Sequence, residues 1–155
     1  MDLEVSLLIK RAENELLAAR ALKKISEDTS LKISAELPSD TTFYSSVISH
    51  AYYAIFYSAK AYLIKRGVML PEQGQHQAVY FAFKKLVRET QIIADLIAFY
   101  DEIKLKTETL LEIFETEGEN RAKFTYKTLA QANKEPAESS IRNAQLFFSY
   151  IKNLT

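Results

Sequence analysis

The sequence predicts an all-α fold, an up-and-down helical bundle of about five helices, and three observations support this prediction. Only three glycines and three prolines occur among 155 residues, so few positions interrupt a helix. Apolar residues recur at helical spacing through most of the chain. Hydrophobic residues make up 48% of the total, which is enough to fill one core at this length. We therefore expect residues 1–155 to form a single domain.

The first predicted helix is Leu3–Ile25, which carries apolar residues along one face. Asp2 and Glu4 suit the positive N-terminal end of such a helix. The next stretch, Ser26–Asp40, is polar and contains a proline near its end, so we expect a connection whose last Ser, Asp or Thr residues cap the following helix.

The second predicted helix, Thr42–Gly67, is the central one, because nearly every side of it is crowded. Its face of large residues consists of Ile48, Tyr52, Ile55, Phe56, Ala59 and Leu63. A stripe of small residues, where another helix could come close, consists of Ala51, Ala54, Ser58 and Ala61. A third line carries one polar group per turn and consists of Ser46, His50, Tyr53, Tyr57 and Lys60.

The remainder of the chain predicts three more helices. A turn at Gly67–His76 contains two glycines and a proline and precedes a helix over Gln75–Glu89. A longer amphipathic helix is expected over Ile92–Glu115, ending near Gly118, with apolar residues repeating as in helical bundles. A loop with some helical character follows, and Pro136 lies in the first turn of the last helix.

The composition excludes several classes of protein. Without cysteine the chain has no disulfide, no Cys-based zinc site and no thiol nucleophile, which fits a cytoplasmic location. We expect no signal peptide and no membrane span. Acidic and basic side chains number 20 each, so any contact with nucleic acid must come from a local patch.

One segment of the central helix resembles a known family. Ser49–Ala61 reads Ser-His-Ala-Tyr-Tyr-Ala-Ile-Phe-Tyr-Ser-Ala-Lys-Ala and is similar to the Ser-x-Ala-Tyr-Tyr-Ala-Met-Phe-x-Ala-Ala-x-Ala signature of HEPN-domain proteins. His76 matches a histidine that these proteins often carry after the glycine ending that helix, and Arg121 and Tyr126 match part of an Arg-x-x-x-Asp-Tyr pattern. The resemblance implies a small all-α domain.

The sequence departs from the branch of this family that acts as metal-independent ribonucleases. Members of that branch carry an Arg followed four to six residues later by a His, in which the His can accept the ribose 2′-hydroxyl proton and the Arg can neutralise the phosphate. No arginine in this chain is followed by a histidine at that distance, and Arg66 lies ten residues before His76 across a turn. We therefore expect no catalytic residues of that type.

The candidate ligand-binding residues combine aromatic rings with cations, which could stack on a nucleobase and neutralise a phosphate. They are His50, Tyr53, Tyr57, Lys60, His76 and Arg121. Four of them have a structural alternative: His50 as a core or helix-contact residue, His76 as a helix cap, Tyr53 as a packing partner of Tyr52, and Arg121 as a surface or capping side chain. Two histidines without acidic partners at ligand spacing predict no metal site, and we expect no cofactor.

Three functional hypotheses follow. The first is a non-catalytic HEPN-like binding module for a nucleotide, an RNA or a partner protein. The resemblance implies, as such a partner, a minimal nucleotidyltransferase in a toxin–antitoxin or defence-type system. The second is a degenerate ribonuclease that uses His50 or His76 with Arg121, and the third is a purely structural dimeric scaffold. We expect a homodimer, formed through the small-residue stripe or the aromatic margin of the central helix.

Overall fold

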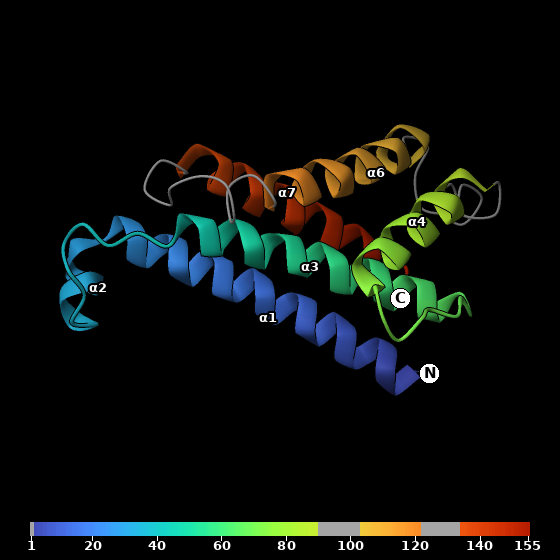
Figure 1. The fold of residues 1–155 in the computed structure, drawn as a ribbon, viewed down its shortest axis with the longest axis horizontal. Helices are drawn as coiled ribbons and strands as arrows, with labels where there is room; N and C mark the ends of the chain where they lie inside the picture. The colour runs from blue at the N-terminus through green and yellow to red at the C-terminus, as the bar shows by residue number, and fades with distance from the viewer. Residues whose placement is uncertain (1, 90–102, 122–133) are drawn as a thin grey trace.

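The computed structural model describes residues 2–89, 103–121 and 134–155, and within these ranges the regular elements are all helices. They are α1 (Asp2–Glu27), α2 (Thr29–Ser34), α3 (Tyr44–Lys65), α4 (Gln75–Arg88), α6 (Ile103–Asn120) and α7 (Lys134–Lys152). The all-α prediction is confirmed. In Figure 1, α3 returns alongside α1, α6 and α7 lie on the other side of α3, and α4 lies at the end where both termini are found.

The stretch predicted as a polar connection is partly helical, which corrects that prediction. Its first two residues belong to α1, and α2 follows directly, with Asp28 as N-cap accepting a hydrogen bond from the Leu31 amide at 3.0 Å. Lys32 is buried and donates to the Ser39 carbonyl at 3.0 Å. Ser26 Oγ donates to the Leu22 carbonyl at 2.7 Å and accepts from the Phe43 amide at 2.8 Å, which fixes the start of α3 against α1.

The central helix was predicted almost to its ends. It begins at Tyr44, two residues late, because no side-chain oxygen caps it and the Phe43 amide is already bonded to α1. It ends at Lys65, where Gly67 adopts a left-handed conformation with φ of 74°. The Gly67 amide donates to the Ile64 carbonyl and the Val68 amide to the Leu63 carbonyl, a C-terminal motif that favours glycine.

The helix predicted over Ile92–Glu115 is only partly described, because residues 90–102 lie outside the described ranges. The described part, α6, continues past Gly118 and ends at Asn120, two residues beyond the glycine near which its end was predicted. A glycine inside a helix costs only about 1 kcal/mol. Here Glu117 is buried and accepts hydrogen bonds from Asn143 Nδ2 of α7 at 3.0 Å and Asn120 Nδ2 at 3.3 Å, which anchors this last turn. The loop predicted over residues 122–133 also falls outside the described ranges.

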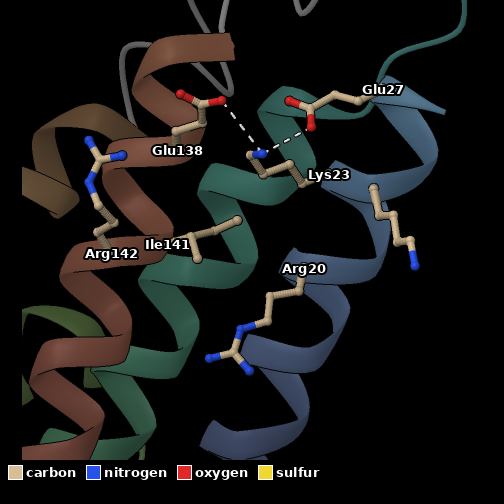
Figure 2. Close-up of a pocket in the computed structure, with 7 residues that line it drawn as sticks. Arg20, Lys23, Glu27, Glu138, Ile141 and Arg142 are labelled. Atoms are coloured by element: carbon tan, nitrogen blue, oxygen red, sulfur yellow. Dashed lines mark hydrogen bonds and ion pairs between the residues drawn. The ribbon is translucent and has the colours of Figure 1, made fainter.

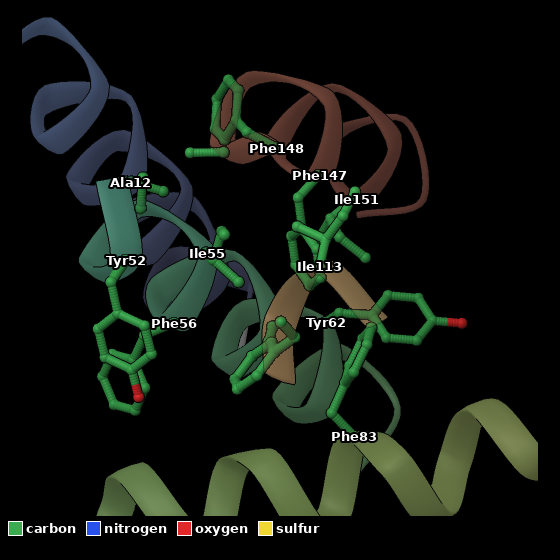
Figure 3. Close-up of a cluster of buried hydrophobic side chains, with 14 of the residues drawn as sticks. Ala12, Tyr52, Ile55, Phe56, Tyr62, Phe83, Ile113, Phe147, Phe148 and Ile151 are labelled. Carbon is green, nitrogen blue, oxygen red and sulfur yellow. The ribbon is translucent and has the colours of Figure 1, made fainter. Parts of the chain in front are cut away.

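The core lies around α3, and the predicted face of large residues is buried throughout. Figure 3 shows side chains from α1, α3, α4, α6 and α7 meeting there. Phe83, Phe114 and Phe147 join α4, α6 and α7 through ring contacts with centroids 5.4–5.8 Å apart. Among the helices of the described ranges, none is both long and apolar enough to cross a membrane.

The stripe of small residues is also buried within the single chain. Ala51, Ala54, Ser58 and Ala61 each have no exposed surface. Since α1 and α7 are packed against α3, the close approach predicted for this stripe occurs inside the monomer. The prediction that the stripe forms a dimer interface is therefore wrong.

Candidate functional site

An aromatic cluster joins α3 to the start of α4. The His76 ring stacks on Phe56 with centroids 4.3 Å apart and on Tyr52 at 5.8 Å. The Tyr52 hydroxyl lies 3.2 Å from His76 Nδ1, within hydrogen-bonding distance. The turn before α4 positions this imidazole, because Gly74 is left-handed and the preceding Gln75 side chain accepts a hydrogen bond from Lys60 Nζ at 2.8 Å.

Arg121 approaches the same cluster from the end of α6. Its guanidinium carbon lies 4.7 Å from the centre of the Tyr52 ring and 5.9 Å from that of Tyr53, distances typical of cation–π contacts. The continuation of α6 past Gly118 brings this residue to α3. Burial raises the pKa of the Tyr52 hydroxyl, and the positive charge of Arg121 opposes that shift. The cluster therefore joins a partly buried cation to stacked rings.

A pocket of about 420 Å³ opens beside this cluster, between α3, α4 and α6. Its volume lies in the range of small-molecule sites. We call it the His76 pocket; its lining residues are Tyr52, His76, Gln77, Tyr80, Phe81, Phe114, Glu115, Gly118, Glu119 and Arg121. Phe81 is 61% exposed at its edge. The pocket thus combines aromatic walls with one arginine and two carboxylates.

A second group of contacts continues from Tyr53 along the surface of α3. The Tyr53 and Tyr57 rings stack with centroids 6.2 Å apart, and the Arg11 guanidinium of α1 lies 4.9 Å from the centre of Tyr57. Arg11 also pairs with Glu15 at 3.6 Å, and the other oxygen of Glu15 lies 2.6 Å from His50 Nδ1. Side-chain contacts therefore connect His50 to the His76 pocket. They run through Glu15, Arg11, Tyr57 and Tyr53.

The structure brings the predicted site residues together to different degrees. His76 and Arg121 line the pocket, and Tyr53 contacts both. Tyr57 lies one ring further away, and His50 contacts Glu15 outside the pocket. Lys60, which was also predicted as a site residue, does not line the pocket, and its amino group donates to the Gln75 side chain instead.

Three residues of this region were not predicted as site residues. Tyr52 was assigned to the core face, and only 5% of its surface is exposed, yet its hydroxyl meets His76. Arg11 and Glu15 lie on the first helix and were not among the candidate residues. Their spacing of four residues is a signal for an ion pair on one helix face, but it does not show that the pair meets another helix.

Within the ranges that the structure describes, no group of three or more His, Cys, Asp or Glu side chains could hold a metal ion.

The protonation of His76 leads to a testable pH dependence. Burial, and then the Arg121 charge, lowers the pKa of His76 below its ordinary value of 6.5. The imidazole of His76 therefore binds a proton more tightly in the unfolded chain than in the folded one. Its contribution to folding stability is fully present above about pH 6.5, and it is lost as the pH falls toward the lower pKa of the folded state. We expect the wild-type free energy of unfolding to fall more between about pH 7.5 and pH 5 than that of His76→Phe. Urea unfolding at both pH values measures the difference, and equal losses in the two proteins would contradict it.

The fold and the pocket define a small all-α domain built around one central helix, with an aromatic site next to that helix. The model of the HEPN domain family matches residues 19–154. That range includes every described helix except the first part of α1, and the chain belongs to the HEPN domain family. No curated protein matches the chain significantly.

Proposed function

We propose that this HEPN domain is a non-catalytic binding module whose His76 pocket takes a nucleotide or the end of an RNA chain. The observation that carries the proposal is the position of Arg121, with its guanidinium over the Tyr52 ring and beside His76. Aromatic and guanidinium planes both stack on nucleobases, and arginine also pairs with phosphate oxygens. This arrangement can hold both the base and the phosphate of a nucleotide.

The charges around the pocket narrow the type of ligand. Glu115 and Glu119 line it together with Arg121, and the lowered pKa of His76 favours a neutral imidazole at pH 7. A ligand with many negative charges would be repelled by the two carboxylates. A base whose N–H groups donate to a carboxylate, joined to a single phosphate at Arg121, fits better. The proposed ligand is therefore a nucleoside monophosphate or one terminal nucleotide of RNA.

Titration with nucleoside monophosphates and a short single-stranded RNA tests this proposal. We expect His76→Phe, which keeps the ring but loses both nitrogens, to weaken binding by about tenfold, the effect of losing one good hydrogen bond. His50→Phe is the matched control, because His50 lies outside the pocket and contacts Glu15. Binding that is equal in the two variants would exclude the His76 pocket, and no binding by the wild type would favour the scaffold hypothesis.

One observation favours a second candidate function, metal-independent RNA cleavage. The lowered pKa keeps His76 unprotonated at neutral pH, and Arg121 is close enough to affect it. His76 could therefore accept the 2′-hydroxyl proton while Arg121 holds the phosphate; the 2′-oxygen would attack phosphorus and the 5′-oxygen would leave with a proton from solvent. The absent Arg-to-His motif counts against this function. Shortened RNA in the titration above, abolished by His76→Phe, would establish it.

The homodimer, the nucleotidyltransferase partner, the toxin–antitoxin or defence context and the cytoplasmic location stay predictions. With the small-residue stripe buried, the remaining candidate contact surface on α3 is its aromatic margin, where Tyr53 and Tyr57 are partly exposed. Partly exposed tyrosines are common at protein interfaces. A partner that covers them would bind next to the His76 pocket, since the Tyr53 ring contacts His76.

A further inference from the structure

A second concave region lies on a different face of the molecule, between α1 and α7. This groove has a volume of about 600 Å³ and shares no lining residue with the His76 pocket. Charged side chains make up most of its walls: Arg20, Lys23, Lys24, Glu27, Glu138 and Arg142. We call it the α1–α7 groove; Figure 2 shows it with Lys23 between the two glutamates.

Two lysines neutralise both carboxylates of the groove. Lys23 Nζ lies 3.0 Å from Glu27 Oε2 and 3.5 Å from Glu138 Oε1. Lys134 Nζ, at the start of α7, lies 3.8 Å from the other oxygen of Glu27. The hydrogen bond with Glu27 is the main reason why the pKa of Lys23 is raised, which keeps this lysine charged. The carboxylates are therefore engaged by partners within the fold.

The other three cations of the groove have no such partner. Among the residues that the structure describes, none forms a hydrogen bond or ion pair with the side chain of Arg20, Lys24 or Arg142. The lining residues carry four positive and two negative charges, an excess of two, and Lys134 beside Glu27 raises the excess to three, on a chain whose formal net charge is zero. The His76 pocket has the opposite balance, with two carboxylates and one arginine.

We propose that the α1–α7 groove binds a diphosphate or triphosphate chain, carried by pyrophosphate or by a nucleoside triphosphate. Arg20 on α1 and Arg142 on α7 present guanidinium groups, which pair with phosphate oxygens through two parallel hydrogen bonds. Such a chain carries about three or four negative charges near neutral pH, which matches the excess in the groove. Ile141 adds an apolar surface between the charged walls.

Isothermal titration with sodium pyrophosphate tests the proposal directly. The critical variant is Arg20→Gln combined with Arg142→Gln; both side chains are exposed, so the fold is retained, which a thermal melt verifies. We expect the wild type to bind pyrophosphate in a salt-dependent manner and the double variant to bind about tenfold more weakly or worse. Lys10→Gln is the matched control, because it removes one exposed positive charge from α1 outside the groove.

A second series with ATP distinguishes the two sources of the phosphate chain. Tighter binding of ATP than of pyrophosphate, lost in the double variant, would support a nucleoside triphosphate. Equal binding of both would support the phosphate chain alone. His76→Phe should leave pyrophosphate binding unchanged, which separates this groove from the His76 pocket. No pyrophosphate binding by the wild type, or undiminished binding by the double variant, would overturn the proposal.

Discussion

Replacing Phe147 by alanine is expected to lower the free energy of unfolding by about 3–5 kcal/mol, the usual cost of truncating a buried phenylalanine. Phe147 has no exposed surface, and its ring centroid lies 5.4 Å from that of Phe83 and 5.8 Å from that of Phe114. Its removal would leave a cavity where α4, α6 and α7 meet. For a chain of this length the melting temperature should fall by roughly 6–20 °C, which calorimetry or a CD melt can measure.

The same substitution at Phe81 provides the control for this prediction. Phe81 lies on α4 and is 61% exposed, so Phe81→Ala loses a ring of the same size without opening a buried cavity. We expect a change in unfolding free energy within about 0.5 kcal/mol, as for most surface substitutions. Equal losses in the two variants would show that the three-phenylalanine cluster does not hold these helices together.

The central helix was predictable because its residue types reflect its burial on most sides. A helix that is covered on most sides needs apolar or small residues at nearly every position, and Thr42–Gly67 shows that pattern without a helix-breaking residue before its end. A left-handed glycine then ends it, which sequence rules also anticipate. The fold class followed mainly from this helix and from the scarcity of glycine and proline.

The errors in the other elements have tertiary causes. A short helix within a polar stretch, α2, is stabilised by the Asp28 cap and by contacts such as Lys32 to Ser39, which local periodicity does not reveal. The predicted end of α6 followed the rule that glycine ends helices. The buried Glu117, bonded to Asn143 of α7, outweighs that local preference.

The sequence predicted which residues belong to the candidate site better than it predicted how they contact one another. The resemblance and the helical spacing selected His76, Arg121 and Tyr53, which do come together. The pairing of His50 with Glu15 links residues 35 positions apart, and a single sequence carries no signal for so distant a contact. A helical line of polar groups also need not face one cavity, because different helices cover its successive turns.

Replacing Ala54 by leucine is expected to destabilise the fold by overpacking the core around α3. Ala54 has no exposed surface and belongs to the core cluster, so three additional carbon atoms could enter only by displacing neighbouring helices. Such insertions cost about 1–3 kcal/mol, which should lower the melting temperature by roughly 2–12 °C in a chain of this length. Urea unfolding monitored by CD gives the loss in free energy.

Ala21→Leu makes the matching change at an exposed position of α1 and controls for the intrinsic helix preference of leucine, which is close to that of alanine. If the small-residue stripe exists to bring helices together within one chain, Ala54→Leu alone should lose stability, and the loss should not depend on protein concentration. A loss that shrinks as the concentration rises would instead connect Ala54 to assembly between chains, contrary to its burial in the monomer. Equal stability of the two variants would show that the helices around α3 have room to move apart.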